Sequence, residues 1–160
     1  MLETATLETI LERHGRNPAN IIAILQDIQS AANWLPEEDL RRVCQELDIP
    51  LSKMMALATF YKAFSLKPRG KHIVQVCLGT ACHVRGGERI EGAVERELGV
   101  GAGETDADLQ WTLETVGCLG ACALGPILVI DGEYHGQMTS AKATRLLSRI
   151  KKAGGNGSEE

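Results

Sequence analysis

The segment His72-Ile73-Val74-Gln75-Val76-Cys77 is a run of β-branched and apolar residues that ends on a cysteine. Such a run predicts a β-strand that is mostly buried. It follows Lys67-Pro68-Arg69-Gly70, a polar stretch with proline and glycine that is typical of a domain boundary. We therefore expect a helical domain over residues 1–66, a second domain over residues 67–153 and a disordered tail over residues 154–160.

The residues after this strand predict a small α/β domain. The expected elements, in chain order, are a helix marked by Ile90, Val94 and Leu98, a strand over residues 111–116, a hairpin of strands 127–130 and 133–135, and a last helix over residues 139–152. Asp131-Gly132 is a favoured two-residue turn for the hairpin. This order of elements is compatible with a thioredoxin-like fold.

The residues before the boundary predict a bundle of four helices, so the whole chain is expected to be α+β. Asn17 and Pro18 are a typical N-cap and first helical residue, and they predict the start of the second helix. Pro36 is expected to start the third helix and Ser52 to cap the fourth. Apolar residues at helical spacing define the buried stripes, for example Leu7, Ile10, Leu11, Ile21, Leu25, Ile28, Leu40, Val43, Cys44, Leu47, Met54 and Ala58.

Composition argues against several classes of function. The formal net charge is −4, and only two each of Trp, Tyr and Phe are present. The net charge gives no electrostatic reason to expect nucleic-acid binding, and so few aromatic residues argue against a base-stacking platform. No basic leader with an apolar core and no apolar run long enough to cross a bilayer is found. We expect a soluble, cytoplasmic protein without direct membrane insertion, in which thiols stay reduced and a cysteine cluster favours metal over disulfides.

Five cysteines form two pairs and a singleton. Cys77 and Cys82 have C-x4-C spacing, and Cys118 and Cys122 have C-x3-C spacing. Each pair follows a predicted strand, and the ends of two neighbouring strands would bring the four thiols together. Cys44 lies on the apolar stripe of the third helix, where a free cysteine packs as a small hydrophobic residue.

The spacing of the two pairs favours a [2Fe–2S] cluster, and two alternatives remain open. Structural zinc sites usually pair cysteines as C-x2-C, closer than either pair here. A redox-active disulfide usually has C-x-x-C spacing, which is also absent. The plant-type C-x4-C-x2-C run does not occur, so the ordinary plant ferredoxin is excluded. No Ser/His/Asp or paired-carboxylate arrangement stands out, and no catalytic residue is assigned.

Blocks along the chain resemble a known family. They are Ala58-Thr59-Phe60-Tyr61, Lys67-Pro68-Arg69-Gly70, Val74-Gln75-Val76-Cys77, Cys82-His83-Val84-Arg85-Gly86-Gly87 and Gly117-Cys118-Leu119-Gly120-Ala121-Cys122. Together they are similar to the NuoE-type subunit of complex I, a family that includes small subunits of soluble NAD(P)-linked hydrogenases and formate dehydrogenases. The resemblance covers about residues 5 to 150.

The resemblance implies a helical bundle followed by a thioredoxin-like domain with one [2Fe–2S] cluster. It implies that the four ligands are Cys77, Cys82, Cys118 and Cys122. It further implies an electron-transfer subunit, not an enzyme by itself, whose partner is a flavoprotein that binds FMN and NAD(P) within a larger assembly.

Three departures from the complex I pattern favour a hydrogenase or formate dehydrogenase complex, including electron-bifurcating ones, over respiratory complex I. Gly117 stands where complex I members tend to have an acidic residue. Leu124-Gly125-Pro126 replaces their Asn-Ala-Pro, and Tyr134-His135-Gly136 resembles the Val-His-Gly of hydrogenase-type relatives.

Overall fold

The computed structural model describes residues 2–155 and divides into two compact units, residues 1–69 and residues 70–160. Each unit has its own hydrophobic core. None of the helices in the described part of the chain is both long and apolar enough to cross a membrane.

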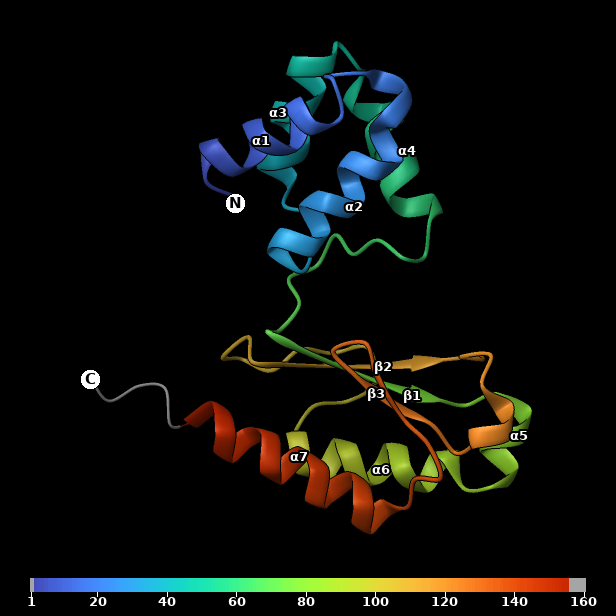
Figure 1. Cartoon of the computed structure of the whole chain (residues 1–160). Coiled ribbons are helices and arrows are strands. Elements are labelled where there is room, and N and C mark those ends of the chain that lie inside the picture. Colours follow the sequence, from blue (N-terminus) through green and yellow to red (C-terminus); the bar gives the residue numbers. More distant parts are fainter. Residues whose placement is uncertain (1, 156–160) are drawn as a thin grey trace. The chain divides into compact units, whose positions relative to one another are not determined.

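The first unit is a bundle of helices (Figure 1). Its elements are α1 (Thr4–Arg13), the short 3-10 helix η1 (Pro18–Asn20), α2 (Ile21–Ala32), α3 (Glu37–Leu47) and α4 (Leu51–Phe60). The predicted apolar stripes face inward and form one core, in which Leu11, Ile24, Leu25, Ile28, Leu40 and Met54 are fully buried. Cys44 belongs to this core and is 8% exposed, as expected of a cysteine that packs as a hydrophobic residue.

The helix starts in this unit are partly as predicted. The side chain of Asn17 accepts a hydrogen bond from the backbone N–H of Ala19, so Asn17 caps η1 with Pro18 at its first position. Pro36 precedes α3 as expected. The prediction for Ser52 was wrong, because α4 begins at Leu51 directly after Pro50. Pro50 itself has φ −58° and ψ 134°, and the helix starts without a side-chain cap hydrogen bond.

An ionic contact joins α1 to α2 and makes the stability of this unit depend on pH. The Asp27 carboxylate accepts hydrogen bonds from His14 Nε2 and Arg13 Nη1, both at 2.9 Å. The hydrogen bond from His14 is the largest effect on the pKa of Asp27 and lowers it. Burial raises this pKa by less, and the hydrogen bond and positive charge of Arg13 lower it further. A lowered acid pKa stabilises the fold above the pKa of the unfolded chain, and this contribution is lost as the pH falls through the folded value.

We expect Asp27→Asn to lower the free energy of unfolding at neutral pH by about 1 kcal/mol or less, since the pair is partly exposed. The difference from wild type should shrink as the pH falls below the ordinary range for aspartate. Urea unfolding of the full chain at several pH values measures this. Glu38→Gln is the control, because Glu38 is an exposed carboxylate without an ion pair among the described residues. If the difference in unfolding free energy between wild type and Asp27→Asn increased below the ordinary pKa range of aspartate, the stabilising role of the Asp27 carboxylate would be contradicted.

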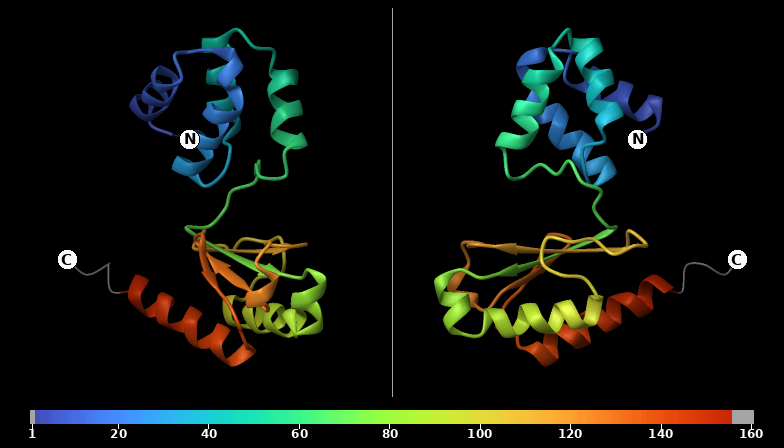
Figure 2. Two further views of the ribbon diagram at one scale, coloured as in Figure 1. Left: turned by 45° about the vertical axis from the view of Figure 1, so that its right-hand side comes forward. Right: turned by 180° about the vertical axis from the view of Figure 1, so that it is seen from behind.

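The second unit is a mixed four-stranded sheet with two long helices on one face (Figure 2). Its elements are β1 (His72–Cys77), α5 (Thr80–Val84), α6 (Gly87–Leu98), β2 (Trp111–Val116), the 3-10 helix η2 (Cys122–Leu124), β3 (Leu128–Ile130), β4 (Glu133–His135) and α7 (Ser140–Gly155). The strand order is β2-β1-β3-β4, with β1 parallel to β2 and antiparallel to β3. The core lies between the sheet and the helices α6 and α7.

The structure confirms the two long strands and the hairpin and adds two short helices. Asp131 and Gly132 both have positive φ, 52° and 85°, as the predicted two-residue turn requires. Helices α5 and η2 were not predicted, and they place Cys82 and Cys122 on helical turns instead of in open loops. Helix α7 continues through Gly155, beyond the predicted end, and the rest of the predicted tail lies outside the described residues.

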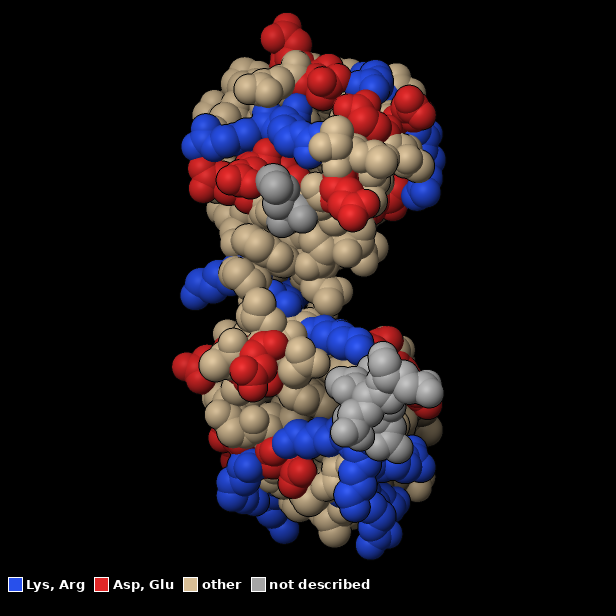
Figure 3. Space-filling model, turned by 90° about the vertical axis from the view of Figure 1, so that its left-hand side faces the viewer, with Lys and Arg blue, Asp and Glu red and all other residues tan. Residues whose placement is uncertain are grey.

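The exposed side of α7 is basic. Lys142, Arg145, Arg149 and Lys152 are exposed and recur at helical spacing, and α7 contains no acidic residue. Figure 3 shows basic side chains gathered at the lower edge of this unit. The opposite side of α7 contributes Ala143 and Leu147 to the core.

Candidate metal centre

The parallel pairing of β1 with β2 brings the cysteine segments to one edge of the sheet. Cys77 ends β1 and pairs in register with Val116, which ends β2, so Cys118 follows only two residues beyond this pair. The backbone N–H of Leu78 donates to the carbonyl oxygen of Val116 at 2.9 Å, and this bond keeps the two segments together past the strand ends. Because carboxyl ends of parallel strands meet at the same edge, the expected approach of the two segments follows from topology.

Cys77 and Cys82 form the first pair of thiols, and both are buried. Burial acts to raise the pKa of Cys77, but hydrogen bonds from the backbone N–H groups of Gly79 and Leu119 and from the Cys82 thiol together lower it. Burial, the hydrogen bond with Cys77 and neighbouring thiolate charges raise the pKa of Cys82. The amides therefore favour a thiolate at Cys77, and thiolate is the form in which cysteine binds metal.

Cys118 and Cys122 form the second pair, and both are exposed. Their sulfur atoms lie 3.9 Å apart. The backbone N–H of Gly120 donates to Cys118 Sγ at 3.3 Å, and Gly120 has a φ of 79°, a conformation that glycine adopts without strain. The hydrogen bond with Cys118 is the main cause that raises the pKa of the Cys122 thiol.

The structure therefore brings together the four cysteines assigned by the resemblance as two pairs, Cys77 with Cys82 and Cys118 with Cys122. The negative charge of Cys122 raises the pKa of Cys82, and the negative charge of Cys77 raises the pKa of Cys122. Within residues 2–155, no group of three or more His, Cys, Asp or Glu side chains is close enough to hold one metal ion. Cys44 lies in the other unit, in a core where burial raises its pKa.

Two glycines let the segments approach closely. A Cβ atom on Gly79 would lie 2.6 Å from the carbonyl oxygen of Gly117, which belongs to the segment after β2. A Cβ atom on Gly125 would lie 3.1 Å from Cys82 Sγ and 3.2 Å from the carbonyl oxygen of Cys122. The contacts of Gly79 with Gly117 and of Gly125 with Cys82 join one cysteine segment to the other, so a side chain at Gly79 or Gly125 would separate the segments.

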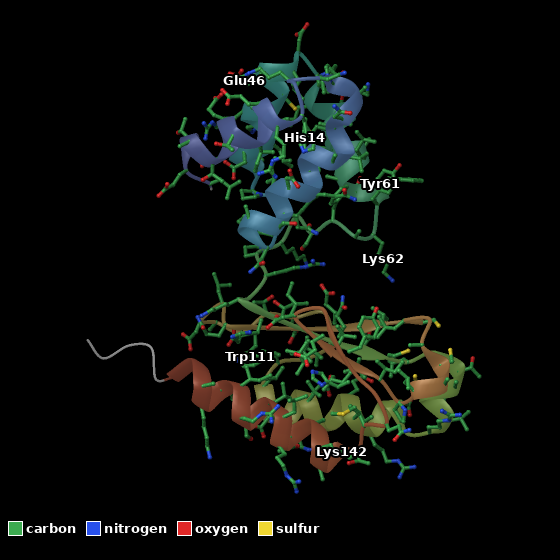
Figure 4. The ribbon with its side chains drawn as sticks, viewed as in Figure 1. His14, Glu46, Tyr61, Lys62, Trp111 and Lys142 are labelled. Carbon is green, nitrogen blue, oxygen red and sulfur yellow. The ribbon has the colours of Figure 1, made fainter. Side chains whose placement is uncertain are left out.

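The site is at the α5 end of the sheet (Figure 4), where several of the yellow sulfur atoms gather. Trp111, which begins β2, lies at the opposite end. His83 follows Cys82 but is exposed, with Nδ1 3.5 Å from Glu88 Oε1. Arg85, three residues after Cys82, hydrogen-bonds to carbonyl oxygens of the second cysteine segment. These partners are distant in sequence, so no local pattern points to the contact.

The fold and the paired thiols define an iron–sulfur protein of thioredoxin-like type, and comparison with known proteins agrees. The model of the thioredoxin-like [2Fe–2S] ferredoxin family matches residues 7–151, and the chain belongs to this family. The cofactor of the family is a [2Fe–2S] cluster, so the sequence-based prediction of cofactor and fold is confirmed.

Two curated relatives cover most of the chain. The chain is 33% identical over 145 residues to the NuoE-type subunit of the NADH-quinone oxidoreductase of Pseudomonas aeruginosa, covering 91% of this chain and 87% of the relative. It is 28% identical over 142 residues to the HndA subunit of the NADP-reducing hydrogenase of Solidesulfovibrio fructosivorans, covering 89% and 81%.

A solved structure agrees with the fold. The air-oxidized NAD+-reducing [NiFe]-hydrogenase matches with a TM-score of 0.72 and 18% identity over 84% of this chain. The match spans only 23% of that hydrogenase chain. At this identity the likeness concerns the fold.

Proposed function

We propose that Cys77, Cys82, Cys118 and Cys122 are the ligands of one [2Fe–2S] cluster and that the chain is an electron-transfer subunit. The observation that supports this most directly is the arrangement of four thiols as two pairs at the shared edge of β1 and β2. Such a cluster has two irons and takes four cysteine thiolates, so two pairs fit it. When bound, it accepts and returns single electrons.

The chain's own groups around the thiols fit this chemistry. The backbone N–H groups of Gly79 and Leu119 donate to the Cys77 sulfur and that of Gly120 to Cys118. Hydrogen bonds to sulfur stabilise the added negative charge of a reduced cluster and raise its potential. The burial of Cys77 and Cys82 limits access of water on one side of the site. The exposed pair, Cys118 and Cys122, marks the face at which electrons would be exchanged.

The partner in this proposal is a flavoprotein subunit that binds FMN and NAD(P), within a hydrogenase, formate dehydrogenase or complex I assembly. Support comes from the relatives, which are named as subunits of an NADP-reducing hydrogenase and of NADH-quinone oxidoreductase. The departures at Gly117, at residues 124–126 and at residues 134–136 favour a soluble, cytoplasmic hydrogenase or formate dehydrogenase complex, including bifurcating ones.

We assign partner docking to the helical domain, residues 1–66, and electron transfer to residues 67–153. Phe60, at the end of α4, is 79% exposed and contacts Tyr61 edge to face, with ring centroids 5.1 Å apart. Exposed aromatic side chains of this kind are enriched at interfaces between proteins.

The test of the proposed function is a metal and spectroscopic analysis of anaerobically purified protein. We expect about two irons and two sulfides per chain and, after reduction with dithionite, an EPR signal of one unpaired electron. The signal should be absent before reduction. Stoichiometric zinc without iron would overturn the proposal in favour of a structural zinc adaptor. Co-purification with an FMN-containing subunit that oxidises NAD(P)H would support the assigned partner, and a stable complex without flavin would contradict it.

A further inference from the structure

Arg85 connects the two cysteine segments. It directly follows α5, the short helix that carries Cys82, and it caps the end of that helix. Its Nη1 atom donates hydrogen bonds to the carbonyl oxygen of Cys122 at 3.3 Å and to that of Gly125 at 3.2 Å. These oxygens lie at the beginning of η2 and just after it, so the guanidinium group holds the turn that carries Cys122.

Gly125 shows how closely these groups converge. A Cβ atom built on this glycine would lie 3.1 Å from Cys82 Sγ and 3.6 Å from Arg85 Nη1. A thiol of the first pair, the turn of the second pair and the guanidinium group therefore meet at one point. The spacing leaves no room for a side chain at residue 125 without a shift.

Most other hydrogen bonds of the turn that carries Cys122 join backbone groups. Within the turn, the N–H of Gly125 donates to the carbonyl oxygen of Cys122 and the N–H of Leu124 to that of Ala121. The Cys77 sulfur accepts from the N–H of Leu119 in the second cysteine segment, and among residues 2–155 Arg85 is the side chain from outside the segment that hydrogen-bonds to residues 121–126. Without the Arg85 side chain, the turn would be held by its own backbone hydrogen bonds and by three others. These join residue 124 to residue 137, residue 126 to residue 138, and residue 127 to the end of β1.

The positive charge of Arg85 is not neutralised by a carboxylate among the described residues. The nearby ion pair of α5 and α6 joins His83 to Glu88 and does not include Arg85. Reduction adds one negative charge to an iron–sulfur cluster, and a nearby cation stabilises the reduced form more than the oxidised form.

We propose that Arg85 is a positioning residue of the iron–sulfur site, which fixes the Cys122 turn against the Cys82 helix and raises the reduction potential through its charge. This inference rests on the proposed function, because it takes Cys82 and Cys122 as ligands. If Arg85 served folding alone, variants that keep the cluster would have the same reduction potential as the wild type.

Three substitutions separate the two effects. Arg85→Lys keeps the charge but loses the planar group that reaches both carbonyls. Arg85→Gln removes the charge and keeps a polar donor, and Arg85→Ala removes both. Arg89→Gln is the matched control, because Arg89 is an exposed arginine at the start of α6 whose side chain makes no hydrogen bond to the cysteine segments.

The experiment uses the full chain with its cluster and measures two quantities. An EPR-monitored redox titration gives the potential, and absorbance during incubation with a chelator gives the rate of iron release. For Arg85→Gln and Arg85→Ala we expect about a tenfold fall in the one-electron equilibrium constant for reduction, which is about 59 mV. Arg85→Lys should keep the potential of the wild type. Arg85→Lys and Arg85→Ala should release iron at least about tenfold faster, because one lost hydrogen bond corresponds to about that factor and Arg85→Ala loses two.

The outcomes distinguish this inference from the proposed function. If wild-type protein shows the EPR signal and all Arg85 variants match Arg89→Gln in potential and release rate, the role of Arg85 is overturned and the proposed function stands. Faster release with an unchanged potential in Arg85→Gln and Arg85→Ala would overturn the effect of charge. Wild-type protein that binds no iron would overturn the proposed function and this inference with it.

Discussion

Cys77→Ser should cost the protein most of its iron and its EPR signal. The backbone around Cys77 stabilises its thiolate, because the N–H groups of Gly79 and Leu119 lower its pKa against the effect of burial. A serine hydroxyl does not ionise near neutral pH, so the position would lose the anionic sulfur that iron–sulfur clusters require. Iron and sulfide analysis, together with EPR after reduction, measures the effect.

Cys44→Ser is the control for this substitution. Cys44 lies in the core of the helical unit, and its replacement should lower stability while leaving the iron content of the folded protein unchanged. Loss of iron from Cys44→Ser, or full retention of iron and of the signal in Cys77→Ser, would show that the ligand set is wrong.

Gly79→Ala should separate the two cysteine segments and weaken cluster binding. The new Cβ atom would lie 2.6 Å from the carbonyl oxygen of Gly117, a distance that forces one backbone segment to move. Overpacking of this kind costs about 1–3 kcal/mol, and here the neighbouring atom belongs to backbone and cannot rotate away. We expect a lower unfolding temperature of the metal-free chain and faster loss of iron to a chelator from the loaded protein.

Gly117→Ala is matched to this substitution. Gly117 is the other member of the same contact, but a Cβ atom built on it meets no atom within 4 Å. The two variants make the same chemical change and differ only in the direction of the added methyl group. Equal iron retention in both would mean that the close approach at Gly79 is not needed for the site.

Much of the fold follows from patterns that are local in sequence. The runs that form β1 and β2 consist of β-branched and apolar residues, and their bounds were predicted without error. The hairpin between β3 and β4 depends on the pair Asp131-Gly132, which the turn geometry requires. The two missed helices, α5 and η2, are too short to show a helical period.

The site was harder to predict from local sequence patterns than the fold. Spacing alone left iron–sulfur, zinc and disulfide chemistry open, and resemblance to a family selected the cluster. The contact of Arg85 with Cys122 and Gly125, and that of Gly79 with Gly117, join residues far apart in the chain. These contacts form because β1 pairs with β2 and so brings the two cysteine segments to one edge of the sheet. The sequence of either segment alone does not predict this pairing.

The parallel pairing of β1 with β2 has a consequence for the folding of the protein. Parallel strands cannot be joined by a tight turn, and here α5, α6 and a long loop connect them. A cluster held by cysteines from both ends of this crossover would tie them as a disulfide ties a loop and would reduce the conformational entropy of the unfolded chain. Cluster insertion and closure of the sheet would then be thermodynamically linked, and iron supply would set how much of this unit is folded.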